Sequence, residues 1–527
     1  MPSHARIGCN GRQHKPPATV GRRRHTTKGR DIIMETSISR RSFVAGAAAL
    51  GAAAAVGASA ASAFADEAES AATADQECDV LVIGGGITGS IAALAALSAG
   101  IENVTLVEKQ FYIGGSAALS SAYMVTVEND NFGDDVDDSW ETTRDYLMSI
   151  HSLSPDTQHP DIEHLTYIFS EQSATIDFML SLGMTAEFIT KSTAVTAWEG
   201  EGEGMMASLA TIMDELGVNV LLSTPALELT TDEDGAVTGA VVENDEDGQF
   251  TITAKKTILA CGGASHNDEI LTKYMPTFAT IDFDNKAAAG DTGDGFVMAE
   301  AVGAKLYDSM VFAGAGVSVD SDWKSATSVR LSTSSQLLVD AEGVRFMSEN
   351  PAASGGSQIL TYNFVEHGSP AYYFIYNATD DTLEALQTGI EMGCVFYGDT
   401  PEELAEAAGL DVETFTATFE AYQAACEAGV DEEFGKDADD LVAYDLDAGL
   451  YAVYYRAASW GTIGGVVVDS GCRVWGKDGK IIENLFAGGE MSNRDLFSDF
   501  YIGGNSLATS STRGRIAGET AAAEILG

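Results

Sequence analysis

The segment from Asp79 to Gly100 narrows the possible folds of this chain more than any other. It begins with the apolar run DVLVI, continues with the glycine cluster GGGITG and ends with SIAALAALSAG, in which apolar residues recur at helical spacing. This order is typical of a buried parallel strand that turns at once into a helix. A second apolar run, Val104–Val107, ends in Glu108 about twenty residues after the glycines. The pattern predicts a dinucleotide-binding βαβ unit within an α/β fold.

Each glycine of the cluster has its own expected task. Gly84 permits the tight turn, Gly86 lets the backbone approach a pyrophosphate, and Gly89 lets the helix pack on the strand. The free N–H groups at the start of the helix then face phosphate, and the carboxylate of Glu108 can accept both ribose hydroxyls. The alternative is a glycine-rich turn that binds nothing. The strand before it, the helix after it and the acid at this distance favour the nucleotide site.

Later segments favour FAD over NAD as the dinucleotide. The small residues of 114–118 (GGSAA) let a bulky isoalloxazine ring lie against the backbone. Residues 256–263 predict a strand that ends in a glycine pair, and the hairpin before it turns at Asp247-Gly248. Residues 485–490 predict a further strand that ends in two glycines and an acid.

The segment GGNSL at 503–507 predicts the start of the terminal helix. The positive end of that helix would point at the N1/C2=O edge of a reduced flavin. Taken together, the residues that we expect to bind the cofactor are Gly84, Gly86, Ile87, Thr88, Gly89, Glu108, Lys109, Gly115, Ser116, Ala226, Gly262, Asp294, Gly489, Glu490, Gly504, Asn505, Ser506 and Leu507.

Charge and cysteine content exclude several other classes of function. The chain has 527 residues, 29 Lys and Arg, 79 Asp and Glu and a net charge of −50, so it would repel nucleic acid and anionic lipid surfaces. Its length predicts two to four domains, on the basis of roughly 150 residues per domain. The 6 cysteines are scattered, with no CxxC, CxxCH or Cys/His cluster. The sequence therefore carries no signal for haem, iron–sulfur or metal ligation.

Residues 34–65 resemble an export signal. Arg40 and Arg41 form the paired arginines, an Ala/Gly/Val run follows, and Ala63-Phe64-Ala65 supplies a cleavage site. A transmembrane anchor is the alternative, and the weakly apolar run with its small-residue end argues against it. We expect a cleaved twin-arginine signal and export to the periplasm or the outer face of the cell envelope, with no stable membrane insertion after cleavage. Residues 1–33 are a mis-called start or an extension.

Eight sequence blocks in order resemble the FAD-dependent family of fumarate reductase flavoproteins and 3-ketosteroid dehydrogenases, from about residue 77 to residue 527. The blocks are VIGGGITGSIAALAA, LVEKQFYIGGSAALSS, TILACGGASHNDEI, AGDTGDGFVMAEAVGA, VDAEGVRFMSE, GTIGGVVVD, LFAGGE and GGNSLATSSTRGRIAGETAA. The resemblance implies an α/β fold in which a Rossmann-like FAD-binding domain, residues 77–313 and 460–527, carries an inserted α+β capping domain, residues 314–459. A helical hairpin is expected at 400–429. The GGSAALSS block has no His, which implies non-covalent FAD.

The resemblance fails at the residues that bind fumarate in the family. The proton-donating arginine is replaced by Ala353, the arginine before the GGN motif by Tyr501, and the histidine before T-x-G-G by the sequence around Trp460. A second histidine is missing from 310–319. A dicarboxylate would meet no cation at these points, and an uncompensated buried carboxylate costs several kcal/mol. We therefore do not expect fumarate to be the substrate.

Tyr501 is the first candidate catalytic residue. Its hydroxyl can donate to a carbonyl oxygen and stabilise developing enolate charge, and the dehydrogenases of the family also carry a tyrosine here. Tyr123 and Arg494 are further candidates for proton transfer and substrate contact, although Tyr123 can equally be a packing residue and Arg494 the partner of an acid. The tyrosines at 362, 372, 373 and 376 are interpreted as packing residues of a cap strand.

Three functions remain open. The first is reduction of a conjugated C=C bond in an enone or aryl-unsaturated acid, with hydride from the flavin to the β carbon and a proton from a tyrosine or arginine to the α carbon. The second is the reverse reaction, a 3-ketosteroid-type dehydrogenase. The third is a flavin-binding protein whose catalysis has decayed. Because the chain has no haem motif, either reaction needs a separate cytochrome or flavoprotein as electron partner.

Overall fold

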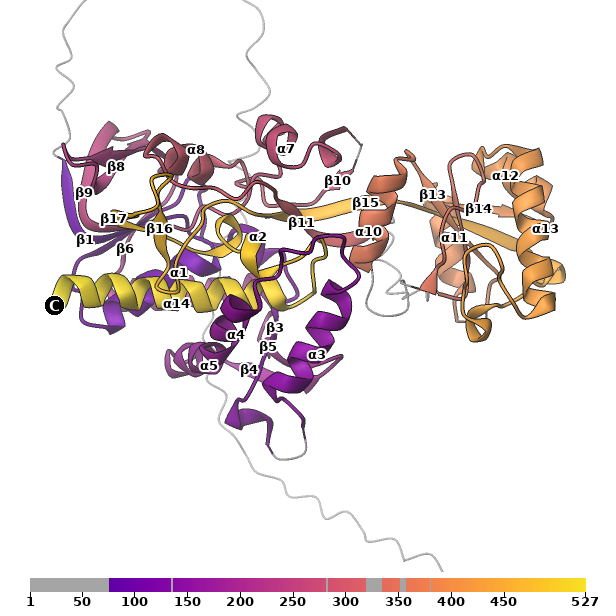
Figure 1. Cartoon of the computed structure of the whole chain (residues 1–527), viewed down its shortest axis with the longest axis horizontal. Helices are drawn as coiled ribbons and strands as arrows, with labels where there is room; N and C mark the ends of the chain where they lie inside the picture. Colours follow the sequence, from indigo (N-terminus) through magenta and orange to yellow (C-terminus); the bar gives the residue numbers. More distant parts are fainter. Residues whose placement is uncertain (1–74, 134–135, 281–282, 319–333, 351–356, 380) are drawn as a thin grey trace, which may run out of the picture. The chain divides into compact units, whose positions relative to one another are not determined.

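The computed structural model describes residues 75–527 except 134–135, 281–282, 319–333, 351–356 and 380 (Figure 1). All the described residues belong to one compact unit. The expected export signal at 34–65 and the position of Ala353 lie outside the described residues.

This unit is built on an eight-stranded sheet. Strand β1 (Gln76–Ile83) lies at its centre and pairs in parallel with β2 (Val104–Val107) on one side and β9 (Gly248–Leu259) on the other. The outer strands are β6 (Asn219–Leu221) beside β2, β17 (Ile481–Ala487) and β16 (Arg473–Trp475) beyond β9, and the hairpin strands β8 (Val237–Asn244) and β7 (Ala226–Thr231). Leu81 and Val82 are fully buried, as expected for strands covered on both faces.

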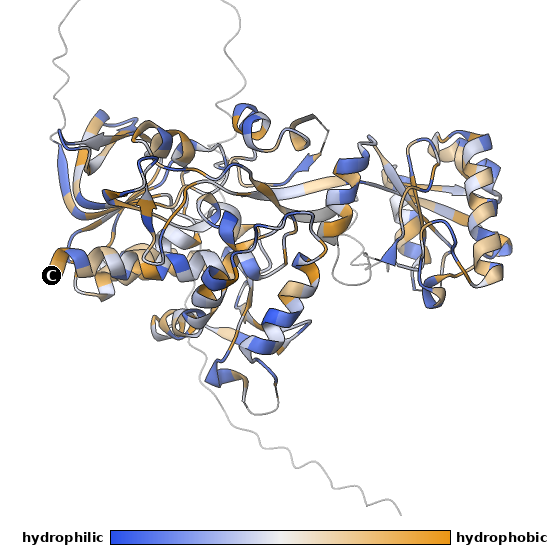
Figure 2. Ribbon diagram, in the orientation of Figure 1, coloured by the Kyte–Doolittle hydropathy of each residue, from blue (hydrophilic) through white to orange (hydrophobic). Residues whose placement is uncertain are grey.

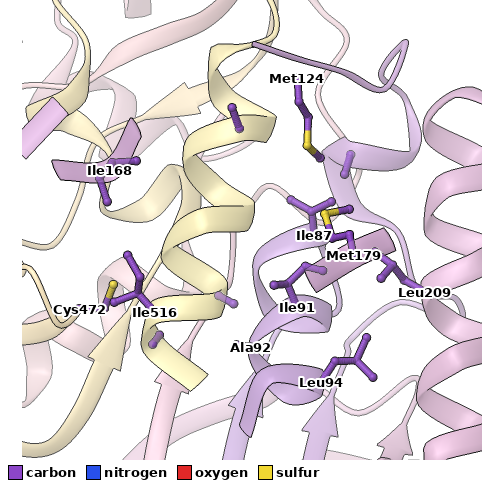
Figure 3. Packing of buried hydrophobic residues seen from close by; sticks show 14 of the residues in the cluster. Ile87, Ile91, Ala92, Leu94, Met124, Ile168, Met179, Leu209, Cys472 and Ile516 are labelled. Carbon is purple, nitrogen blue, oxygen red and sulfur yellow. The ribbon is translucent and has the colours of Figure 1, made fainter. Parts of the chain in front are cut away.

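Two helices pack against each other beside this sheet. Helix α1 (Ile87–Ser98) follows β1, and α14 (Asn505–Leu526) ends the chain. A Cβ on Gly518 would lie 2.3 Å from the carbonyl oxygen of Ala92, so the absence of a side chain there lets the two backbones approach closely. Figure 3 shows the two helices side by side, with Ile91 and Ile516 in one buried cluster.

The local predictions for this part are confirmed. The strand before the glycines, the helix after them, the strand at 485–487 and the terminal helix are all present. The hairpin turn also lies where it was expected, because Asn244 of β8 pairs with Gly248 of β9. One strand, β9, serves both as the second arm of this hairpin and as the strand that leads to the glycine pair.

A second sheet lies mainly in the described part of 314–459. Its longest strand is β15 (Leu450–Ile463). This strand pairs with β11 (Val311–Ser318), β13 (Tyr372–Tyr376), β14 (Val395–Gly398) and the two-residue β10 (Asp284–Asn285). Strand β12 (Leu337–Asp340) pairs with β13. Strands β11 and β15 run across the expected boundaries at 313/314 and 459/460. The division into an FAD-binding and a capping domain stays a prediction.

The helices described in the same part of the chain are α10 (Ser357–His367), α11 (Leu383–Met392), α12 (Pro401–Ala408) and α13 (Val412–Ala428). The pair α12–α13 confirms the expected helical hairpin, and the caps Thr400 and Asp411 accept hydrogen bonds from N–H groups of its first turns. Apolar and polar residues alternate around both helices (Figure 2). The assignment of Tyr362 to a strand is wrong, because this residue lies in α10, whereas Tyr372, Tyr373 and Tyr376 are buried in β13.

A third, small sheet had no signal in the sequence. It consists of β3 (Tyr123–Val125), β5 (Ala194–Trp198) and β4 (Ala186–Thr190). The N–H of Val125 donates to the carbonyl of Gly504 over 3.1 Å, which ties this sheet to the start of α14. The helices nearby in the chain are α3 (Trp140–His151), α4 (Ile162–Ser170), α5 (Gln172–Ser181) and α6 (Glu201–Leu216).

Short helices complete the described structure: α2 (Gly115–Ala118), α7 (Asp268–Tyr274), α8 (Asp294–Ala301), and the 3-10 turns η1 (Asp130–Phe132), η2 (Phe278–Thr280), η4 (Ala438–Asp440), η5 (Leu446–Ala448), η6 (Gly489–Met491) and η7 (Arg494–Leu496). Among the described residues, no helix combines the length and the apolar character needed to cross a bilayer.

Candidate functional site

A cavity of about 870 Å³ lies at the carboxyl ends of the central parallel strands. This is the edge at which open α/β sheets bind their ligands, and the volume suits a cofactor or a large organic ligand. Its wall includes the residues that follow β1, β2 and β9, the starts of α1 and α14, and the turn that precedes β5.

Most of the expected cofactor-binding residues lie on this wall. They are Gly84, Gly86, Ile87, Thr88, Glu108, Lys109, Gly115, Ser116, Ala226, Gly262, Asp294, Gly489, Glu490, Gly504, Ser506 and Leu507. Gly89 and Asn505 do not line the cavity. Gly89 packs directly beneath the turn, where a Cβ would lie 1.9 Å from the carbonyl oxygen of Gly84. Contact of these residues with the cofactor stays a prediction.

The turn between β1 and α1 is shaped by backbone contacts. Gly84 has a φ of +110°, and a Cβ there would lie 2.3 Å from the carbonyl oxygen of Ala260. Gly86, in contrast, has no atom within 4 Å of where its Cβ would be, so its backbone stands open to the cavity. The N–H of Gly85 donates to Oε2 of Glu108 over 2.6 Å, which holds the carboxylate at the end of β2. The arrangement fits a ribose and pyrophosphate beside a glycine turn.

Two helices begin at this cavity without a side-chain cap. Helix α1 starts after Gly86 and helix α14 after Gly504, which has a φ of +81°, and neither has a side chain bonded to its first N–H groups. The first N–H groups of a helix need acceptors and carry its positive end. A phosphate and the N1/C2=O edge of a flavin are acceptors of the required charge, so both helix starts fit FAD.

A pair of acids stands on the same wall, and only one of them was expected. Asp291 and Glu490 both line the cavity, and Oδ1 of Asp291 is buried with no hydrogen-bond partner in the described structure. Burial raises the pKa of Asp291. Burial and the charge of Asp291 together raise the pKa of Glu490 well above its usual value. The unpaired oxygen is available to form a hydrogen bond with a bound group. In the GDTGDG segment, Asp294 was predicted to bind the cofactor and Asp291 was not.

Lys109 and Asp294 are already partners. Nζ of Lys109 lies 2.6 Å from Oδ2 of Asp294 and also contacts the hydroxyl of Thr292. This ion pair bridges the residue after β2 and the start of α8 at the cavity wall. No grouping of three or more His, Cys, Asp or Glu side chains suited to a metal occurs in the part of the chain that the structure describes.

Both tyrosine candidates lie on the cavity wall. The ring of Tyr501 stacks on that of Phe497, with centroids 5.8 Å apart and 9° between the planes. Burial raises the pKa of the Tyr501 hydroxyl, and the charge of Glu490 adds to the effect, so this group stays a neutral hydrogen-bond donor. Tyr123 belongs to β3 and carries the ammonium of Lys191 over its ring face.

Arg494 lies outside the cavity lining, contrary to the expectation that it contacts the substrate. Its side chain is 2% exposed, and Nη2 lies 2.7 Å from Oδ2 of Asp156. The other guanidinium nitrogens donate to the carbonyl of Phe497 and to the hydroxyl of Ser309. The arginine is the partner of an acid, which was the alternative considered for it. It holds the backbone shortly before Tyr501 in place.

Several residues on the wall were missed because no motif marks them. Tyr146, Lys191, Ser192, Thr193 and Glu201 come from the region of the third sheet and its helices. Trp460, which lies where the resemblance predicts a histidine, also lines the cavity and is 41% exposed. The third sheet is formed by pairing between strands that are far apart in the chain, β3 with β5. Such pairing leaves no local pattern from which these positions could be predicted.

Comparison with known proteins agrees with this geometry. The model of the family described as FAD binding domain matches residues 79–507. A probable fumarate reductase, Ifc3, of Shewanella frigidimarina is 28% identical over 466 residues, which cover 86% of this chain and 76% of that protein. A 3-oxosteroid 1-dehydrogenase of Mycolicibacterium smegmatis is 29% identical over 357 residues, 60% of this chain and 62% of that protein.

The fold has a counterpart among solved structures. The open conformation of a flavocytochrome c3 fumarate reductase superposes with a TM-score of 0.68 at 26% sequence identity. The match covers 87% of this chain and 80% of that one. It agrees with the expected α/β fold around an FAD site.

Proposed function

This chain belongs to the FAD binding domain family and is an FAD-dependent oxidoreductase, and from that premise we propose that it reduces a conjugated C=C bond in an enone or aryl-unsaturated acid other than fumarate. Bound FAD supplies the hydride-transfer chemistry. The chain's own residues bind the substrate, orient it and hold the proton.

The observation that carries the proposal is the position of Tyr501. Its neutral hydroxyl lines the cavity three residues before Gly504, which caps α14. A tyrosine O–H there can donate to a substrate carbonyl oxygen and stabilise the negative charge that develops when the conjugated bond is attacked. Aromatic rings line the same cavity, those of Tyr112, Tyr123, Tyr146 and Trp460 among them, and they suit a flat conjugated substrate.

Fumarate fits this wall poorly. A dicarboxylate needs two cationic partners, and the wall carries Tyr501 and Trp460 at two positions where the family's fumarate-binding cations were sought. Two basic residues line the cavity in the described structure; Lys109 is already paired with Asp294, which leaves Lys191 as one cation for two carboxylates. Leaving a buried carboxylate without a partner costs several kcal/mol.

The same tyrosine supports a second candidate. A hydroxyl that polarises a ketone also helps to remove a proton from the neighbouring carbon, so a 3-ketosteroid-type dehydrogenase working in the oxidative direction uses the same donor. A decayed flavin-binding protein is less well supported, because the cavity wall retains a tyrosine hydrogen-bond donor beside the cap of α14.

The cellular setting is part of the proposal. A twin-arginine signal at 34–65 would export the folded protein to the periplasm or the outer face of the envelope, with FAD bound non-covalently. A separate cytochrome or flavoprotein would supply the electrons. The inserted segment 314–459 would cap the flavin.

The test uses purified holoprotein, photoreduced without oxygen and mixed with fumarate, a cinnamate-type acid, urocanate, an isoflavone-type enone or a 3-ketosteroid. Reoxidation is followed by flavin absorbance. Reoxidation by an enone or an aryl acid, but not by fumarate, is the expected result. Fast reoxidation by fumarate would overturn the substrate assignment. Reduction of the oxidised enzyme by a saturated ketone, with no reoxidation by any acceptor, would establish the dehydrogenase.

A further inference from the structure

The turn between β4 and β5 places a lysine on the cavity wall. Lys191, Ser192 and Thr193 form this turn and all line the cavity. The N–H of Lys191 donates to the carbonyl of Thr193 over 2.9 Å, which closes the turn. The lysine side chain itself is exposed to the cavity and to solvent.

Lys191 has no acidic partner among the described residues, which sets it apart from most described basic residues. Nearly all described lysines and arginines form an ion pair with a carboxylate; Lys191, Lys305 and Lys480 form none with a described residue. Of these three, only Lys191 lines the cavity. In a chain with a net charge of −50, acids are plentiful, so an ammonium left unpaired beside the cavity is available to an anionic ligand. Glu201, an acid on the same wall, does not pair with it in the described structure.

The ammonium is held in place by an aromatic ring. Nζ of Lys191 lies 3.3 Å from the centroid of the Tyr123 ring, a cation–π contact. Tyr123 pairs with Ala197 of β5, and its carbonyl oxygen would lie 3.4 Å from a Cβ on Gly504. The same short strand therefore adjoins both the cap of α14 and the lysine, which puts the cation on the part of the wall where the proposed substrate would bind.

We propose that Lys191 is a specificity-determining residue that binds the carboxylate of the substrate, and that the substrate is an aromatic unsaturated monocarboxylic acid. The inference rests on the proposed function. It narrows the substrate class from an enone or an aryl-unsaturated acid to the aryl-unsaturated acid alone. The one unpaired cation on the described part of the wall satisfies one carboxylate, and the aromatic side chains of the cavity contact the rest of the molecule. A diacid would leave its second carboxylate without a partner.

The test measures binding rather than turnover. Oxidised holoprotein is titrated with a cinnamate-type acid and with the primary amide of the same acid, and the perturbation of the flavin absorbance gives the dissociation constant of each. The variants are Lys191→Gln and, as a matched control, Lys480→Gln, which removes another exposed, unpaired lysine that does not line the cavity. The ratio of flavin to protein is recorded for every variant.

We expect K191Q to weaken binding of the acid by about 10- to 100-fold, the usual size of a hydrogen bond to a charged group. Binding of the amide, the flavin content and all values for K480Q should stay unchanged. Added salt should weaken binding of the acid to the wild type and have little effect in K191Q.

The contrary outcomes separate the two proposals. Equal affinity of wild type and K191Q for the acid, or binding of the amide alone, would overturn the role of Lys191 while C=C reduction could still be observed with photoreduced enzyme. Loss of flavin from K191Q would assign the lysine to the cofactor and overturn the inference as well. No binding and no reoxidation by any compound of the panel would overturn both proposals.

Discussion

The backbone N–H of Gly85 donates to Oε2 of Glu108 over 2.6 Å, so the glycine turn after β1 and the acid after β2 form one rigid unit. The N–H of Gln110 donates to the other oxygen of Glu108 over 2.7 Å. A carboxylate bound at both oxygens cannot swing away from the cavity. It is therefore preorganised for a ligand at the carboxyl ends of the strands.

Replacing Glu108 with Ala should weaken FAD binding by about 10- to 100-fold, because it removes a charged acceptor together with the hydrogen bond that orders the turn. The measurement is the dissociation constant of FAD from the apoprotein by quenching of flavin fluorescence. Glu243→Ala, on the hairpin strand β8, is the control and should bind FAD as the wild type does. Equal affinity in E108A would remove Glu108 from the cofactor site.

Tyr501→Phe should lower the rate of substrate reduction by about 100- to 1,000-fold, the usual loss of an oxyanion-type donor, with unchanged flavin content. Tyr123→Phe keeps the aromatic ring beneath Lys191. It should lower the rate by less than about tenfold, because the Tyr123 hydroxyl is not the main hydrogen-bond donor to the substrate. Single-turnover reoxidation of photoreduced protein gives both rates. A larger effect in Y123F than in Y501F would exchange the roles of the two tyrosines.

Arg494→Met should destabilise the fold by about 3–5 kcal/mol, because it leaves Asp156 without its ion-pair partner and the carbonyl of Phe497 without a donor. Arg144→Met breaks the exposed pair with Asp145 and should cost less than about 1 kcal/mol. Urea unfolding of the two holoproteins at one FAD concentration gives the comparison. Similar midpoints for both variants would contradict the positioning role of Arg494.

Gly518→Val should lower the free energy of unfolding by about 1–3 kcal/mol. The Cβ of the valine would meet the carbonyl oxygen of Ala92 and push α14 away from α1. Ala523→Val makes a comparable addition at an exposed site on the same helix and should change stability by about 0.5 kcal/mol. Thermal unfolding of both variants measures the difference. An unchanged melting temperature in G518V would mean that the helices are not packed this closely.

The contribution of His164 to stability should fall as the pH rises. Its Nδ1 lies 2.8 Å from Oδ2 of Asp495, and this hydrogen bond raises the pKa of the imidazole, although burial opposes the effect. A raised pKa in the folded state gives stability that is fully present below the unfolded value of about 6.5 and is lost as the pH rises through the folded value. The stability gap between wild type and His164→Gln should therefore be larger at about pH 5.5 than at about pH 9. A gap that grows with pH would contradict the ion pair.

The sequence by itself determined the parts whose cause is local. The glycine cluster, the acid about twenty residues later, the hairpin turn at Asp247-Gly248 and the start of α14 all depend on residue types at short, fixed spacings. Turn geometry, strand burial and helix periodicity act over a few residues, so the residues themselves carry the signal.

Only the tertiary structure decided which side chains share the cavity wall. Asp291 lines the cavity although no motif marked it, and Arg494 forms an ion pair with Asp156 instead of lining the cavity. Lys191 lies on the wall because the small sheet pairs Tyr123 with Ala197. Such relationships join residues far apart in the chain, and their energy comes from packing and pairing that no local pattern encodes. Most residues that the sequence predicted for the cofactor site therefore line one cavity, while the candidate group for substrate selection became visible only in the folded chain.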